Sequence, residues 1–340
     1  MLRAVSLLTA SLFLPVFAGE GFRWRLDVAD EICRPDVPEA DSMGGITWVS
    51  NSVYWAVTDE KHKTVVWELD IPVDAVTGKV NACRMRMLCR PEGTDDIEGI
   101  ARDPLDGSMW LVDERDHFIC RFDPVSGRRL PGRVELPAVM GRFRRDFGME
   151  SLTISSDGLS MWTCSEEALA PDGPLSTRRR GSDVRLTRFV RTAAAESWKP
   201  VGQWVYQTDP IAGKPWYNSE NEDMSRSGIS ELCLLDDGTL LTLEREFSVV
   251  LVPRFRCRIY ETDFSQATDV SGRKSLKALA DGAAVSRVGK RVLYDATGFA
   301  MYEGMCLGPK LADGSRILML VSDGDKKSLR NVLALRLSPR

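Results

Sequence analysis

The chain has 340 residues, of which 43% are apolar and 28% are charged, and its formal net charge at pH 7 is −4. This composition is that of an ordinary globular protein. It argues against a nucleic-acid-binding protein, which would normally carry a strongly basic face.

The N-terminus has the features of a secretory signal peptide over residues 1–18. Arg3 precedes an apolar run, and Val16-Phe17-Ala18 forms a small-residue cleavage pattern before Gly19. The run is too short, and wrongly flanked, for a membrane span. We therefore expect export to the periplasm or the medium, with residues 19–340 forming a single soluble domain.

Residues 22–32 alternate like a β-strand but have no partner in the repeat that follows. From there on, one hairpin pattern recurs five times. A short apolar strand opens with an acid, a serine or a glycine, a polar turn follows, and a second strand closes with a charged residue. The five copies span residues 44–59, 98–114, 150–166, 230–245 and 301–323.

Four of these copies carry Asp-Gly between the two strands, at positions 106, 157, 237 and 313. Asp-Gly is a strong hairpin signal, because both central residues of a primed turn need positive φ. Recurrent hairpins of this kind predict an all-β fold, a β-propeller with five blades. A sixth blade could lie within residues 167–228 or 247–300.

The outer strands of the blades follow each hairpin. We expect them at residues 65–69 and 83–88, 118–122 and 133–136, 186–190 and 201–206, 258–260, and 331–337. The last unit then has only three strands, so the N-terminal strand is predicted to complete it and close the ring. Trp55, Trp110 and Trp162, each in a second strand, are expected to pack between blades.

The hairpin order predicts where the acidic residues lie. The start of a first strand and the end of a second strand share one end of the blade, and first strands line the central channel. Glu98, Glu150 and Glu303 should therefore ring the channel mouth, surrounded by Asp59, Glu114, Glu166, Glu244 and Asp323. Crowded carboxylates repel one another, and calcium prefers such oxygen ligands. The alternative is that these acids cap strand ends and pair with arginines for structure alone.

Other sites have less support in the sequence. No Cys-x-x-Cys occurs, and Gly-x-Ser-x-Gly is absent. His62 and His117 occupy matching positions in consecutive units. They are either general acids at the rim of the channel or ordinary residues of a repeated loop. Export and an even cysteine count favour disulfides, and the expected strand order predicts one between Cys33 and Cys89.

The chain resembles the phytase-like family, described as having esterase-like activity of phytase. The most similar segment is residues 229–246, and residues 98–100, 147–152, 259–270 and 302–305 fit the other units. The resemblance covers nearly all of residues 19–340. It implies a secreted β-propeller that hydrolyses phosphoesters or esters.

Together these observations favour a monomeric, calcium-dependent hydrolase of a small-molecule phosphate or carboxylic ester. Its metal ligands would be Glu98, Glu150, Glu303 and Asp323. Arg245 and Arg145 would bind the substrate, and Glu114, Glu166 and Glu244 would be catalytic. The alternative is a non-catalytic envelope protein that binds a ligand on the same face. A third reading is a calcium lactonase resembling the gluconolactonase type.

Overall fold

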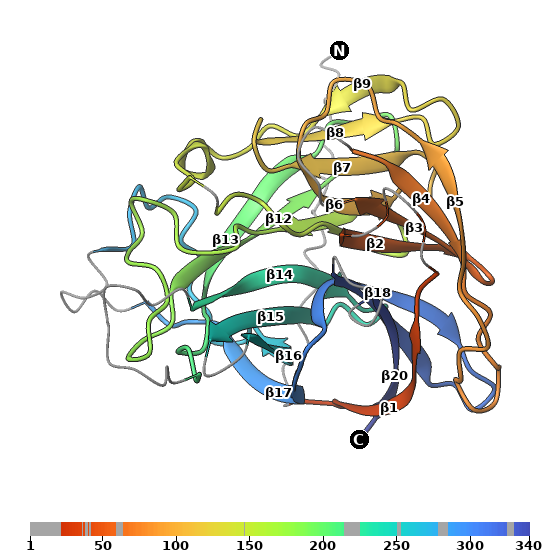
Figure 1. Ribbon diagram of the computed structural model, residues 1–340. Coiled ribbons are helices and arrows are strands. Elements are labelled where there is room, and N and C mark those ends of the chain that lie inside the picture. Colours follow the sequence, from red (N-terminus) through yellow and green to blue (C-terminus); the bar gives the residue numbers. More distant parts are fainter. Residues whose placement is uncertain are drawn as a thin grey trace, which may run out of the picture.

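The computed structural model describes residues 22–35, 37, 40, 42–58, 64–145, 147–213, 225–249, 253–277, 285–324 and 330–340. Within these residues, twenty strands form five four-stranded antiparallel sheets, and one 3-10 helix spans Ala138–Gly141. The sheets are arranged around a central axis like the blades of a propeller (Figure 1). The predicted five-bladed all-β propeller is therefore confirmed. The segments that could have held a sixth blade supply outer strands to the third and fourth blades within the described residues.

The strands of each blade run in order from the axis outward. Blade 1 contains β2 (Met43–Ser50), β3 (Val53–Thr58), β4 (Val66–Asp70) and β5 (Arg84–Cys89). Blade 2 contains β6 (Ile97–Arg102), β7 (Met109–Asp113), β8 (Phe118–Phe122) and β9 (Arg129–Arg133). Blade 3 contains β10 (Thr153–Ile154), β11 (Ser160–Thr163), β12 (Asp183–Val190) and β13 (Lys199–Gln207). Blade 4 contains β14 (Arg226–Leu234), β15 (Leu240–Val249), β16 (Pro253–Asp263) and β17 (Gly289–Gly298).

Blade 5 is assembled from both ends of the chain. It contains β18 (Met301–Lys310), β19 (Arg316–Asp323), β20 (Asn331–Pro339) and, as its outer strand, β1 (Trp24–Cys33). β1 pairs with β20 from Trp24 opposite Pro339 to Cys33 opposite Asn331. The predicted closure of the ring by the N-terminal strand is therefore confirmed.

The hairpin turns differ in detail from the prediction. Gly107, Gly158, Gly238 and Gly314 have φ between 72° and 89°, whereas the aspartates before them are not among the residues with positive φ. A primed two-residue turn would need positive φ at both positions. The Asp-Gly pairs therefore end longer turns, in which only the glycine takes the left-handed conformation.

The hydrophobic core is divided among the five blade interfaces. Each of the five largest buried clusters joins residues of two neighbouring blades. Trp55, Trp110 and Trp162 are only 7%, 3% and 1% exposed and lie in these clusters. Their predicted packing between blades is therefore confirmed, and it holds the inner strands at fixed positions around the axis.

Two local predictions are wrong. The outer strand of blade 2 was expected at residues 133–136, but β9 spans Arg129–Arg133, because its register starts with Arg129 opposite Phe122. The Cys33–Cys89 disulfide is absent, and all eight cysteines are free. Cys33 is exposed at the end of the outer strand of blade 5. Cys89 is buried between blades 1 and 2, so the two thiols face different surroundings.

Several predictions concern residues outside the described part of the chain. The signal peptide over residues 1–18 is among them, as are Asp59 and His62. In the part that the structure describes, no helix is long and apolar enough to cross a membrane.

Candidate functional site

The inner strand of every blade contains a one-residue β-bulge near its start. In blade 2, Ile97 lies opposite Asp113 and Gly99 lies opposite Val112, so Glu98 is the extra residue. The same one-residue shift lies just before β10 in blade 3, between Met149 and Thr153, and within the inner strands of blades 1, 4 and 5. The bulge residues are Glu98, Ser230 and Glu303, and Gly44 and Glu150 hold the equivalent positions in blades 1 and 3. A bulge redirects the side chain of the extra residue. We call the end of the central channel at which the bulge residues lie the mouth.

Glycines next to the bulges allow the inner strands to approach closely at the axis. A Cβ atom at Gly45 would lie 2.8 Å from the carbonyl oxygen of Glu98. One at Gly304 would lie 2.3 Å from the carbonyl oxygen of Gly44. Side chains at these positions would force the strands apart. The glycines therefore keep the bulge residues of neighbouring blades close together.

A second set of residues surrounds the bulge residues, one strand further out. The N–H groups of Glu114 and Glu166 donate to the carbonyl oxygens of Asp96 and Gly148, at 2.8 and 2.9 Å. Arg245 lies opposite Gly228 and Asp323 lies opposite Met301, at the matching register positions. Four blades thus contribute one charged residue each, and Arg245 stands where the others carry an acid.

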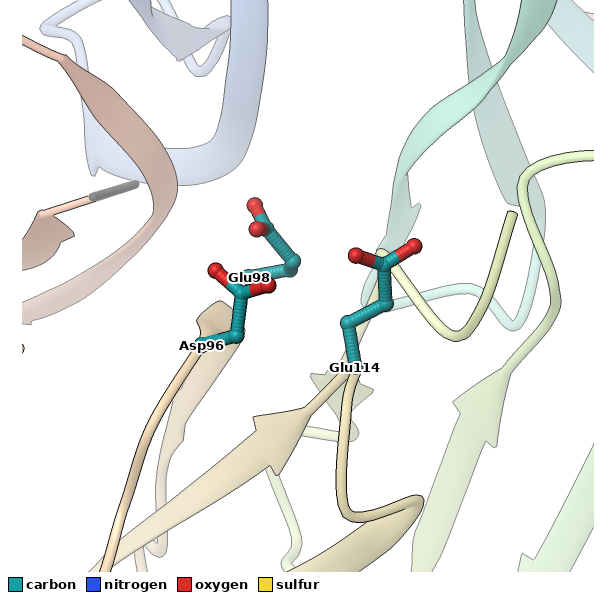
Figure 2. A group of neighbouring side chains, drawn as sticks. All are labelled: Asp96, Glu98 and Glu114. Atoms are coloured by element: carbon teal, nitrogen blue, oxygen red, sulfur yellow. The ribbon is translucent and has the colours of Figure 1, made fainter. Parts of the chain in front are cut away.

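Blade 2 brings three carboxyl groups together at the mouth. Asp96, Glu98 and Glu114 each offer an oxygen atom, and these atoms lie within 4.8 Å of one another. In Figure 2, Asp96 and Glu98 stand at the start of one strand and Glu114 follows the next strand, with their carboxyl groups turned to the same side. Asp96 is 1% exposed. Glu114 also accepts a 2.7 Å hydrogen bond from the N–H of Gly148.

This group fits a hard divalent cation. Calcium binds carboxylate oxygens at about 2.3–2.6 Å, so oxygens on opposite sides of the ion are roughly 5 Å apart. Three carboxylates from a short segment and a following turn can meet this requirement without a large movement. Sequence reasoning identified Glu98 and Glu114 but missed Asp96. Its signal was present, since Asp96 precedes Glu98 by two residues, which is the repeat of a β-strand.

Arg245 joins two other predicted site residues in one buried ion-paired group. Its guanidinium nitrogens lie 3.0 Å from Glu166 Oε1 and 2.8 Å from Glu303 Oε1. The two glutamates come from blades 3 and 5, and Arg245 comes from blade 4 between them. Glu303 was predicted as a metal ligand and Arg245 as a substrate-binding residue. The structure instead pairs them with each other.

Glu150 lies among these charged groups and is 8% exposed. Burial raises the pKa of its carboxyl well above the ordinary value, and the nearby Glu166 raises the pKa further. Arg245 opposes this effect, while Glu114 and Glu303 add to it. Glu150 therefore interacts electrostatically with Glu114 of blade 2 and with the Arg245 group.

Two predicted site residues lie apart from this assembly or at its edge. The carboxylate of Glu244 accepts hydrogen bonds from Tyr206 Oη at 2.6 Å and from Lys290 Nζ at 2.7 Å. Since adjacent strand residues face opposite sides, Glu244 points away from the side taken by Arg245. It belongs to a buried polar network between blades 3 and 4. Asp323 ends β19 opposite Met301 and is half-buried.

A polar cavity of about 480 Å³ opens beside the blade 2 carboxylates. Asp96 and Glu114 line one part of it, and the remaining lining residues are Arg115, His117, Phe143, Arg144, Arg145 and Gly148. His117 has a φ of 49°, and its ring stacks on Phe143 with centroids 4.5 Å apart. Arg144 is anchored by backbone oxygens of Ala168 and Gly173. A cation and an anionic group can therefore be accommodated side by side here, with Arg145 in the wall of the cavity.

Comparisons with known proteins agree with this architecture. The profile of the phytase-like family, described as esterase-like activity of phytase, matches residues 39–326. Among curated proteins, none is significantly similar to the chain.

Similar solved structures are distant relatives at most. One is a PQQ-bound aldose sugar dehydrogenase from Streptomyces coelicolor, with 13% identity, a TM-score of 0.43 and coverage of 93% of this chain and 98% of that one. Another is a streptogramin B lyase, with 13% identity, a TM-score of 0.34 and coverage of 94% and 98%. A third is a virginiamycin B lyase from Staphylococcus aureus, with 11% identity, a TM-score of 0.37 and coverage of 92% and 99%. At these scores the similarities carry no argument about activity.

Proposed function

This chain belongs to the phytase-like family, and from that premise we propose that it is a calcium-dependent hydrolase of a phosphate or carboxylic ester. The reaction takes place at the mouth of the central channel, on the blade 2 side. Asp96, Glu98 and Glu114 are the metal ligands in this proposal. Asp96 replaces Glu303, whose carboxylate is paired with Arg245.

One observation carries the proposal. Two of the three carboxyl groups that fit a hard cation, Asp96 and Glu114, line a cavity whose wall also contains Arg115 and Arg145. A purely structural acidic cluster would not need a 480 Å³ cavity with arginines on its other side. An ester with an anionic group fits this combination, since its charged oxygens can lie between the cation and the guanidinium groups.

The residues of the cavity then have separate roles. When bound, calcium would polarise the phosphoryl or acyl oxygen and lower the pKa of a water molecule. Arg145 holds the negative charge of the substrate. Glu150 lies outside the lining of the cavity, and its buried carboxyl, whose pKa is raised, limits the negative charge next to Glu114. Glu166, although predicted as catalytic, is held by Arg245 and acts as a fixed neighbour.

The test combines metal analysis with a substrate screen of the purified protein. Chromogenic phosphate and carboxylic esters are assayed with calcium and with a chelator, for the wild type and for Glu98→Gln. We expect turnover that is lost with the chelator, restored by calcium and abolished in Glu98→Gln. Glu68→Gln is the matched control, because Glu68 pairs with Arg86 on an outer strand far from the mouth. Tight calcium binding without turnover would instead favour the envelope binding protein. A protein that shows no calcium binding and no turnover would refute both proposals.

We also propose that the protein is exported, from the signal-peptide pattern of residues 1–18. N-terminal sequencing of the protein from a cell envelope fraction should begin at Gly19. A chain that keeps Met1 would contradict this proposal.

A further inference from the structure

Blade 4 departs from the charge pattern of blades 2, 3 and 5 at two equivalent positions. Its bulge residue is Ser230, whereas blades 2, 3 and 5 carry a glutamate there. Its residue opposite the start of the inner strand is Arg245, whereas those blades carry Glu114, Glu166 and Asp323. Both changes reduce the negative charge of the mouth on this side. Among the described residues at these positions of the mouth, blade 4 is therefore the one blade that supplies a positive charge.

Arg245 is held by acids from both neighbouring blades. Its ion pairs with Glu166 and Glu303 are 3.0 and 2.8 Å long, and each glutamate is 4% exposed. Glu166 has little freedom to leave this position, because it packs against Gly228, where a Cβ atom would lie 2.5 Å from Glu166 Cγ. The guanidinium thus occupies a fixed place between two fixed, buried carboxylates.

A cation at this place stabilises the ionised forms of Glu166 and Glu303. Two ionised carboxylates that are buried together repel each other and lose the solvation that water would give them. A metal ion can satisfy them, and so can a guanidinium, which stays charged at any ordinary pH. Because the guanidinium of Arg245 lies between Glu166 and Glu303, these two carboxylates do not bind a metal ion.

We propose that Arg245 is a built-in counter-ion that takes the place of a second metal ion between Glu166 and Glu303. It confines metal binding to the Asp96, Glu98 and Glu114 group. This inference rests on the proposed function for the metal at blade 2, and it adds that the mouth works with one metal ion. Arg245 is in this view a positioning residue, and it does not bind substrate.

The proposal predicts that neutralising Arg245 creates a cation site. In Arg245→Gln, Glu166 and Glu303 lose their shared positive charge, and Glu150 lies close enough to interact electrostatically with both. The variant should bind one calcium ion more than the wild type. Its melting temperature should fall in chelator and recover with calcium, by about 5 °C when calcium is one hundred times its Kd. Arg245→Lys keeps a positive charge and should keep the wild-type stoichiometry.

The matched control is Arg291→Gln in the same blade. Arg291 is 17% exposed at its side chain, close to the 19% of Arg245, and it pairs at 2.7 Å with Glu261, which is 3% exposed. This variant loses a comparable ion pair but leaves only one acid behind. It should be destabilised, it should bind no additional calcium, and calcium should not restore its melting temperature beyond the wild-type response.

The experiment uses the protein comprising residues 19–340. Isothermal titration measures the number of calcium ions bound, and thermal melts are recorded in chelator and in calcium. One ion in wild type and two in Arg245→Gln support both the proposed metal site and this inference. None in wild type and one in Arg245→Gln supports the counter-ion role of Arg245 but refutes the blade 2 site and, with it, the single-metal mouth. One ion in each protein overturns the inference and leaves the proposed function standing, whereas none in either protein overturns both. If Arg245→Gln is unfolded in chelator, refolding with millimolar calcium is the second test, and failure to refold also overturns it.

Discussion

Blades 2 and 4 share a strand order and a bulge, yet they bring opposite charges to the mouth. In blade 2, the bulge residue Glu98 and the residue after β7, Glu114, are acids that meet Asp96 within 4.8 Å. In blade 4, the equivalent positions hold Ser230 and Arg245, and the arginine reaches acids of blades 3 and 5. The bulge decides where a side chain points, and the residue type at that position decides what the site can bind. Fold and site are therefore separable in this protein.

The largest expected effect comes from making blade 4 resemble its neighbours. Arg245→Glu replaces the shared counter-ion by a further carboxylate between Glu166 and Glu303. Breaking a buried ion pair and leaving like charges together should lower the free energy of unfolding by about 3–5 kcal/mol in chelator. Denaturant unfolding measures this change. Arg256→Glu in the same blade should cost about 1 kcal/mol or less, since Arg256 and Asp295 are 29% and 39% exposed. A similar cost for both variants would contradict the central role of Arg245.

A smaller change tests the space around each carboxylate. A Cβ atom at Gly148 would lie 2.4 Å from Glu114 Cγ, and one at Gly228 would lie 2.5 Å from Glu166 Cγ. Gly148→Ala and Gly228→Ala should each lower the free energy of unfolding by about 1–3 kcal/mol, because a neighbouring side chain must move. Only Gly148→Ala should also weaken calcium binding, since only Glu114 belongs to the metal group. Gly141→Ala, with nothing within 4 Å, is the control. Equal calcium affinity in the two test variants would argue against Glu114 as a ligand.

The bulge glutamates of blades 2 and 5 should respond differently to the same substitution. Glu303→Gln loses a charge-assisted contact with Arg245, so its free energy of unfolding in chelator should fall by about 1.5 kcal/mol. Glu98→Gln removes one member of a repelling group and should be as stable as the wild type or more stable. Calcium should raise the melting temperature of Glu303→Gln but not that of Glu98→Gln. Thermal melts in both conditions check this, and a calcium response in Glu98→Gln would exclude it as a ligand.

The last effect depends on pH and concerns Glu231, at the position where blade 2 has Gly99. It is 1% exposed, and burial raises the pKa of its carboxyl well above the ordinary value, against two backbone N–H groups that lower it. A raised folded-state pKa gives stability that is present below about pH 4.5 and is lost as the pH rises toward the folded-state value. Glu231→Gln should remove this loss, which is at most about 1.4 kcal/mol per pH unit. Denaturant unfolding of both proteins at pH 5 and pH 8 measures it, and parallel pH dependence would show that Glu231 does not titrate in this range.

The sequence was sufficient for the blade plan because hairpins repeat. Asp-Gly turns, strand alternation and the unpaired segment before residue 33 predicted five blades and their closure. The same repeat placed Glu98, Glu114, Glu150, Glu166 and Glu303 at one end of the channel, where the structure has them. The prediction succeeds because equivalent positions of the sequence repeat occupy equivalent places in each blade.

The details that failed depend on one-residue differences that a repeat pattern does not contain. Glu244 was taken as the end of a strand, but β15 continues to Val249, and the bulge at Ser230 places Arg245 rather than Glu244 at the mouth. Which acid pairs with an arginine also depends on contacts across blades, such as Arg245 with Glu166 and Glu303. The disulfide was predicted from the expected export and the even number of cysteines. Whether two thiols can meet depends instead on which face of a blade each one occupies.

The composite blade 5 has a consequence for the order in which the protein folds. Trp24 pairs with Pro339, so the last sheet joins residues more than three hundred positions apart along the chain. Contacts of such sequence separation are slow to form, because the chain loses much conformational entropy before they are made. Blades 1 to 4 consist of local hairpins and can form as the chain is synthesised, while β1 must wait for β20. We therefore expect ring closure to be the final step of folding, and hydrogen exchange in refolding protein to protect β1 and β20 last.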